Sequence, residues 1–258
     1  IRDSAYEGRR AAFFRKQLLD MMSIVDAGHN DIDGMQGSWA GAMGHLQFMP
    51  STFLSYATDA DADGRNDIWN SLPDAFSSAA TYLSGIGWRQ GEPVALEVRL
   101  PEKFEYYQAQ LGIRQNTRNW STLGVTQIDG RSLPVLDNAA IILPQGWEGP
   151  AFLVATNFDV VMKWNRSVNY ALSVSHLADQ LLADNPIVKG WGVENVGLTF
   201  NQAWAMQAKL NQLGYDSGKP DGYPGTKTQA AIRNYQLKRH LPADGYPSYG
   251  LFNRLMKE

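Results

Sequence analysis

Apolar residues recur every three to four positions in several segments of this chain, which is the spacing of a helix with one buried face. They predict helices over residues 9–25, from Pro50, over 75–84, from Ser167 to Leu182, from Thr199 to Leu213, over 226–238 and over 248–257. The faces expected to be buried in the first, third and fourth of these helices are Phe13, Phe14, Leu18, Met21, Met22 and Val25; Phe76, Ala79, Ala80 and Leu83; and Ala171, Val174, Leu177, Ala178, Leu181 and Leu182.

The segment from about residue 92 to residue 160 follows a different pattern. Apolar residues occupy every second position from Val94 to Leu100, as they do in a strand. Asp129-Gly130 and the stretch from Pro144 to Gly149 are typical of turns. We therefore expect a small β-rich insertion at about residues 92–160 in a fold that is mainly α, with an α+β character.

Composition narrows the classes of partner. The chain has 258 residues, 44% of them hydrophobic, which is enough for a packed core. A net charge of −3 argues against nucleic acid as a partner. There is no cysteine, so disulfides and thiolate metal sites are excluded. No apolar run is long enough to span a membrane. The chain opens at Ile1 without a signal-peptide pattern, so we expect a processed protein or a fragment.

An acidic loop begins at Asp59 and has the spacing of an EF-hand calcium loop. Carboxylates stand at its first, third, fifth and ninth positions, and Gly64 stands at the sixth, where a sharp bend needs a residue without Cβ. The loop departs from the pattern at position 12, where Asn70 replaces the bidentate glutamate. The residues therefore leave two readings open, a calcium site or a solvated acidic turn.

The stretch from Gly37 to Pro50 interleaves glycine, alanine and serine with large side chains such as Trp39 and Phe48. Small residues let the backbone approach a ligand closely while the large side chains form a wall, so the pattern favours a cleft lining over a helix. A tightly packed loop under a core would have the same composition.

This stretch resembles the G-S-[aromatic]-A-G-A-x-G-x-x-Q-F-M-P signature of the B-type lytic murein transglycosylases, which are similar to glycoside hydrolase family 103 and cleave bacterial peptidoglycan. A second block, Trp164-Asn165-Arg166-Ser167 with Tyr170-Ala171, resembles the family's [YW]-N-x-S-x-x-Y-A segment. The resemblance implies a lysozyme-like domain over residues 1–183. It also implies that the substrate is bound by Ser38, Gln47, Phe48, Tyr82, Trp164, Asn165 and Tyr170.

Two of these residues also have simpler readings. Tyr82 could be a core tyrosine, and Asn165 could be a turn residue before a helix. The family's acidic loop closes with an aspartate that corresponds to Asp74, although Asp74 could equally belong to a capping box that begins at Ser71. The calcium ligands predicted on this basis are Asp59, Asp61, Asp63, Arg65 and Asp74.

The last sixty residues resemble a peptidoglycan-binding module. They follow its L-x-x-L-G-Y…D-G…G-x-x-T…A-I…[FY]-Q…D-G pattern at Leu210, Leu213, Gly214, Tyr215, Asp221, Gly222, Gly225, Thr228, Ala231, Ile232, Tyr235, Gln236, Asp244 and Gly245. The resemblance implies a three-helix domain over residues 198–258. Glycine, proline and polar residues at 184–197 are typical of a linker.

The family uses one glutamate as acid and base and leaves a 1,6-anhydro ring on the muramic acid. Its E-[ST]-x-[FWY]-G motif does not occur in this chain, and family spacing would put it upstream of Ile1. Glu7 does not stand in such a motif, and we interpret it as a polar residue at the start of a helix. The catalytic residue is therefore unknown from this sequence.

The leading hypothesis is a lytic transglycosylase that cleaves the MurNAc-GlcNAc β-1,4 bond of peptidoglycan. The resemblance implies the periplasm or cell envelope of a Gram-negative bacterium, with a lipid anchor on a missing N-terminus as one option. We expect the protein to be a monomer that binds peptidoglycan glycan strands. No organic cofactor is expected, and Ca²⁺ is the one ion considered. The alternatives are a wall-binding protein without catalysis and a hydrolytic muramidase, which would need a second carboxylate near the cleft.

Overall fold

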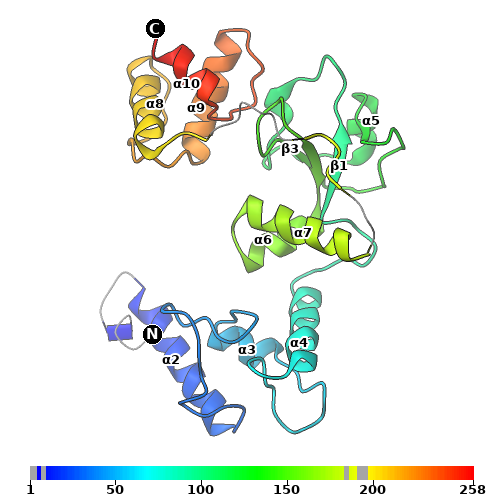
Figure 1. Cartoon of the computed structure of the whole chain (residues 1–258), viewed down its shortest axis with the longest axis vertical. Coiled ribbons are helices and arrows are strands. Elements are labelled where there is room, and N and C mark those ends of the chain that lie inside the picture. The colour runs from blue at the N-terminus through cyan, green and yellow to red at the C-terminus, as the bar shows by residue number, and fades with distance from the viewer. Residues whose placement is uncertain (1–4, 7–9, 183–185, 191–196) are drawn as a thin grey trace. The chain divides into compact units, whose positions relative to one another are not determined.

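The computed structural model describes residues 5–6, 10–182, 186–190 and 197–258. It divides into two compact units, Ile1–Arg89 and Gln90–Glu258 (Figure 1), and both contain buried hydrophobic residues. Glu7 and most of the predicted linker, residues 184–185 and 191–196, lie outside the described residues.

The first unit is built from three described helices, α2 (Ala11–Asp26), α3 (Pro50–Tyr56) and α4 (Leu72–Gly85), so the helices predicted here are confirmed. Helix α2 packs against α3, and α3 packs against α4. Ile24, Phe53 and Ile68 form the centre of the core, because each is at most 1% exposed.

The predicted buried faces of α2 and α4 were partly wrong. The buried residues of α2 are Gln17 and Ile24, and Gln17 is buried because its Oε1 accepts the Ser51 N–H at 3.1 Å at the start of α3. In α4 the side chain of Phe76 is 70% exposed, while Ser78 is buried and its Oγ accepts the Thr58 N–H at 2.9 Å. Both buried polar residues have partners far along the chain, which helical periodicity does not reveal.

The second unit begins with a four-stranded antiparallel sheet in the order β2-β1-β4-β3. The strands are β1 (Ala95–Arg99), β2 (Thr126–Gln127), β3 (Ala140–Ile142) and β4 (Ala151–Val154), so the β-rich segment is confirmed. The central pairing sets Leu96 opposite Leu153 and Val98 opposite Ala151.

Both faces of this sheet are covered. In β4, Ala151 and Leu153 join a core that contains Trp120, whereas Phe152 and Val154 join a second core with Phe158. Because successive side chains of a strand point to opposite faces, a strand without polar residues is buried on both sides.

The helices of this part are η1 (Tyr106–Gln108), α5 (Thr117–Thr122), α6 (Thr156–Trp164) and α7 (Val168–Leu182). Only α7 was predicted, and α6 already begins within the segment read as β-rich. The expected buried face of α7 was also mostly wrong, because Leu177, Leu181 and Leu182 are 62%, 80% and 88% exposed. Ala171 and Ser175 are its buried residues.

The C-terminal residues form three helices, α8 (Phe200–Gln212), α9 (Thr226–Lys238) and α10 (Tyr249–Leu255), as predicted. The capping box at Thr199 is present, with Gln202 as its partner. Met206, Leu210, Ile232 and Leu255 form a core of their own. Among the described residues, no helix is both long and apolar enough to cross a membrane.

Candidate functional site

The stretch from Gly37 to Pro50 is an irregular loop tied by isolated β-bridges, Gly37 to Met43 and Met43 to Phe48, before α3 begins. The expectation of a loop instead of a helix is therefore confirmed, and its role as a cleft lining stays a prediction. Two of its glycines allow close packing of backbone: a Cβ on Gly37 would lie 2.3 Å from the Ala42 carbonyl oxygen within the loop, and one on Gly44 would lie 2.6 Å from the carbonyl oxygen of Ile68 in the acidic loop.

Ser38, Trp39 and Gln47 are among the polar or aromatic residues that this loop presents at the surface. Ser38 is exposed, and its Oγ accepts the Ala42 N–H at 3.1 Å. Gln47 is exposed at a φ of 52°, and its side-chain amide donates to the Gly44 carbonyl at 3.0 Å. Trp39 is 87% exposed and was not among the predicted site residues, although an aromatic at this position belongs to the motif.

Phe48 and Tyr82 lie together, with ring centroids 5.4 Å apart. Phe48 is only 2% exposed, so it backs Tyr82 from the core, and Tyr56 supports Tyr82 from another side at 5.1 Å. Burial and the neighbouring Tyr56 raise the pKa of Tyr82, so its hydroxyl is a neutral hydrogen-bond donor at physiological pH. Contact of either ring with a sugar stays a prediction.

The second predicted block lies in the other unit, at the junction of α6 and α7. Trp164 is the last residue of α6, and Asn165 is its extended C-cap and is exposed. Ser167 caps α7, as predicted, because its Oγ accepts the Tyr170 N–H at 3.2 Å. Tyr170 is 36% exposed. Whether this block and the loop at Gly37 face one cleft stays a prediction.

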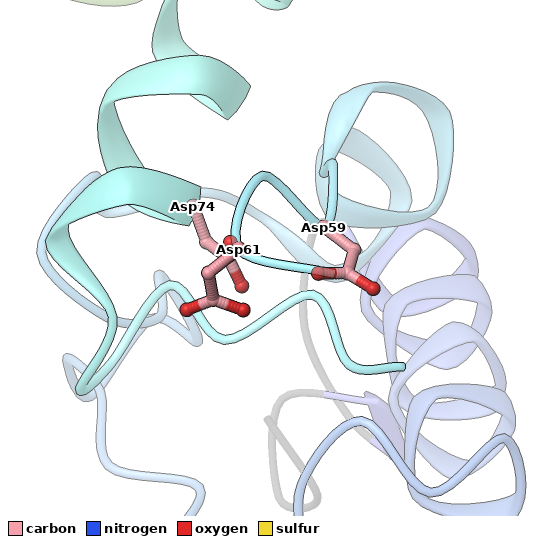
Figure 2. A group of neighbouring side chains, drawn as sticks. All are labelled: Asp59, Asp61 and Asp74. Atoms are coloured by element: carbon pink, nitrogen blue, oxygen red, sulfur yellow. The ribbon is translucent and has the colours of Figure 1, made fainter. Parts of the chain in front are cut away.

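The acidic loop brings three of its predicted ligands together. One carboxylate oxygen from each of Asp59, Asp61 and Asp74 lies within 4.8 Å of the other two. Figure 2 shows that Asp74 comes from the first turn of α4, whereas Asp59 and Asp61 come from the preceding loop. Ser71, which also caps α4, donates its hydroxyl to Asp61 Oδ2 at 2.8 Å.

Asp74 fills its predicted place in a capping box only in part, and its role as a calcium ligand stays a prediction. It lies at the helix start that Ser71 caps, but its own carboxylate is 0% exposed and points into the loop. There Oδ1 accepts the Ala60 N–H and Oδ2 accepts the Asp67 N–H, each at 2.7 Å. The loop is therefore folded around this carboxylate.

The remaining members of the predicted set lie outside this side-chain group. Asp63 Oδ1 accepts the Arg65 N–H at 2.8 Å, which forms a local turn. Asp67, the ninth residue of the loop but not one of the predicted ligands, accepts the N–H groups of Trp69 and Asn70 at 2.9 Å. Burial raises the pKa of Asp67, but the hydrogen bonds from Asn70 and Trp69 lower it by more, so its pKa lies below the usual value.

The three grouped carboxylates fit a hard divalent cation. They supply only oxygen atoms, which calcium prefers, and a cation between them would offset the mutual repulsion of three negative charges this close. The structure thus favours Asp59, Asp61 and Asp74 as the side chains that would hold such an ion, while Asp63 and Arg65 stay predictions.

Comparisons with known proteins agree with these features. The transglycosylase SLT domain model matches residues 2–179, and the peptidoglycan binding domain model matches residues 203–255. Membrane-bound lytic murein transglycosylase B of Escherichia coli (strain K12) is 34% identical over 176 residues, which are 66% of this chain and 46% of that protein. The chain therefore spans about half the length of this curated relative.

Solved structures are similar as well. SltB3 from Pseudomonas aeruginosa, in complex with NAG-anhNAM-pentapeptide, has a TM-score of 0.91 at 44% identity, over 98% of this chain and 68% of that one. The Escherichia coli lytic transglycosylase SLT35, in complex with calcium, has a TM-score of 0.55 at 27% identity, over 67% of this chain and 55% of that one. The chain belongs to the SLT transglycosylase family and carries a peptidoglycan-binding domain after its transglycosylase domain.

Proposed function

We propose that this chain is part of a lytic transglycosylase that cleaves the MurNAc-GlcNAc β-1,4 bond of peptidoglycan and leaves 1,6-anhydromuramic ends. The observation that carries the proposal is the similarity over 98% of the chain to SltB3, a structure that holds NAG-anhNAM-pentapeptide. The envelope is the proposed location, in keeping with the membrane-bound relative from Escherichia coli.

We propose that the predicted substrate-binding residues of each unit contact the glycan strand. Tyr82, Trp164 and Tyr170 offer flat aromatic surfaces against sugar rings, because aromatic faces pack well on apolar ring faces. Ser38, Gln47 and Asn165 offer hydroxyl and amide groups to N-acetyl substituents. The general acid is proposed to come from the upstream glutamate motif of the family, since no residue of this chain matches that motif.

The experiment compares this chain with a longer form extended upstream through that motif. Each is incubated with purified peptidoglycan, and the released muropeptides are identified by mass spectrometry. The proposal expects 1,6-anhydro products from the longer form only. If neither form releases muropeptides while both still bind the wall, the protein is a binding protein. If the products carry reducing ends, it is a hydrolase.

A matched pair of variants in the longer form tests the cleft. Asn165→Ala should slow the formation of muropeptides about tenfold, which is the effect of losing one hydrogen bond to the substrate. Asn169→Ala removes another exposed amide, four residues further along, and should leave the rate unchanged. Equal rates for the two variants would contradict the role of Asn165.

We also propose that Asp59, Asp61 and Asp74 bind Ca²⁺, which would fasten the acidic loop to the start of α4 and stabilise the first unit. The three-carboxylate group supports this, as does the calcium complex of the similar structure from Escherichia coli. A higher melting temperature in excess calcium than in chelator is expected. An unchanged melting temperature would contradict the proposal.

A further inference from the structure

The C-terminal domain contains the tetrapeptide Asp-Gly-Tyr-Pro twice, at residues 221–224 and 244–247. The two copies share their geometry at the aspartate and the glycine. The glycines have φ values of 75° and 73°. In each copy the aspartate Oδ1 accepts the N–H of the tyrosine two residues further on, at 2.9 Å. The two turns are therefore structural equivalents within one domain.

A buried glutamine holds each turn in the same way. Gln207 accepts the Gly222 N–H at 2.9 Å and donates to Asp221 Oδ1 at 2.9 Å. Gln236 accepts the Gly245 N–H at 2.8 Å and donates to Asp244 Oδ1 at 2.7 Å. In both turns Oδ1 is engaged within the domain, and Oδ2 is the oxygen left for an outside partner.

In the second turn that partner is another part of the same unit. Asp244 Oδ2 accepts the backbone N–H of Trp147 at 2.9 Å. The neighbouring Gly146 lies so close that a Cβ there would be 2.8 Å from Asp244 Oδ2 and 3.1 Å from the Tyr246 side chain. The second turn thus binds a secondary amide N–H, and the chain that carries the amide packs on the tyrosine.

The first turn presents the same groups without such a partner. Among the described residues, no hydrogen bond reaches Asp221 Oδ2, and Tyr223 is 72% exposed. Phe200 is 53% exposed, with its ring centroid 5.6 Å from that of Tyr223, and Trp204, four residues further along the same face of α8, is 48% exposed. The Gln207 and Tyr223 hydrogen bonds lower the pKa of Asp221, which keeps its carboxylate ionised at neutral pH.

We propose that the first turn is a peptidoglycan contact of this domain. Asp221 Oδ2 accepts a secondary amide N–H of the wall, as Asp244 Oδ2 accepts that of Trp147, and Tyr223 with Phe200 packs against the apolar surface beside that amide. Peptidoglycan carries such amides both in its N-acetyl groups and in its stem peptides. The inference rests on the proposed function, because it names the surface through which the domain would hold the wall.

The test is co-sedimentation of the full chain with purified insoluble peptidoglycan. Asp221→Asn keeps the internal bonds, because the amide oxygen must occupy the Oδ1 position that accepts two N–H groups, and it replaces Oδ2 with a donor. We expect this variant and Tyr223→Ala to bind about tenfold more weakly. Asp216→Asn, at another exposed aspartate, and Tyr249→Ala, at a tyrosine 42% exposed, should bind like wild type.

Two soluble competitors then separate the possible sources of the amide. Displacement of the wild-type chain by N-acetylglucosamine oligomers identifies the acetamido group, and displacement by the free stem peptide identifies the peptide. If neither displaces it, or if Asp221→Asn and Tyr223→Ala both bind like wild type, the assignment of this surface is wrong. Failure of the wild-type chain to sediment would overturn wall binding itself. Catalysis is judged separately, from the products of the longer form.

Discussion

Replacing Asp74 with alanine is the most informative change in the acidic loop, because this carboxylate serves both the loop and the proposed ion. It is 0% exposed and accepts two backbone N–H groups, from Ala60 and Asp67, at 2.7 Å each. The variant leaves both donors without an acceptor. The loop should then be less stable even when no calcium is present.

The size of the effect follows from these contacts. A buried donor without an acceptor costs about 1 to 3 kcal/mol, so two such donors give roughly 2 to 6 kcal/mol. Ala60 is exposed, which lets water replace part of the lost bond, so we expect about 2 kcal/mol. Calcium at about 100 times its dissociation constant should add about 2.7 kcal/mol to the stability of the wild type and little to that of the variant.

The assay is calorimetric unfolding in excess calcium and in chelator. Asp61→Ala separates the two roles, because Asp61 is exposed and accepts no buried donor pair, so it should lose the calcium effect but keep most of the basal stability. Asp33→Ala removes an exposed carboxylate elsewhere in the same unit and should lose neither. A calcium effect that persists in Asp61→Ala and Asp74→Ala would refute the ion site, and wild-type stability of Asp74→Ala in chelator would refute the hydrogen-bond argument.

Three further changes test the structure by chemical denaturation. Gly44→Ala should destabilise by about 2 kcal/mol, because φ is 61° and a Cβ would lie 2.6 Å from the Ile68 carbonyl oxygen, whereas Gly28→Ala, with φ of 76° and open space, should lose only about 1 kcal/mol. Trp120→Phe should cost about 2 kcal/mol, because a buried indole hydrogen bond of 3.0 Å is lost. Asp67 has a folded pKa below 3.8, so its ionised form stabilises above that pH and the contribution is lost on further acidification. Asp67→Asn should therefore show a shallower loss of stability below pH 3.8, and a slope equal to that of the wild type would count against this.

Local patterns predicted the fold best where each element carries its own signals. Helix α9 has the predicted bounds, Thr226 to Lys238, and α8 buries Ala203, Met206 and Leu210 at the expected spacing. The C-terminal domain is small, and its three helices cover one another, so each apolar face has a neighbour. Periodicity there was enough to identify the core.

Periodicity failed where burial depends on contacts with residues outside the helix itself. Helix α7 has an apolar stripe, but periodicity says only that a face is apolar and not what covers it, and Leu181 is 80% exposed. Gln17 shows the opposite error, because it looks like a surface residue until Ser51, 34 residues away, supplies its partner. Helix α6 was missed because it begins at Thr156, two residues after the end of β4, and its first half was included in the β-rich segment.

Much of the candidate site was predictable from short motifs, but the roles within it were not. The spacing of the acidic loop predicted the approach of Asp59 to Asp61, and the family resemblance added Asp74. Neither predicted that Asp74 would organise the loop by accepting two backbone N–H groups. Likewise, nothing in the motif indicated that Phe48 would be only 2% exposed behind Tyr82.

The repeated Asp-Gly-Tyr-Pro turns show why a motif alone does not identify a binding surface. Their sequences are identical and their internal hydrogen bonds match, so any difference in function must come from what lies against them. One turn is covered by Trp147 and leaves its aspartate 8% exposed, whereas the other leaves its tyrosine 72% exposed. The covered copy supplies the geometry of a secondary amide bound to this turn, and the exposed copy can accept one from outside. If that geometry governs wall binding, replacing a single oxygen of Asp221 should weaken it without disturbing the fold.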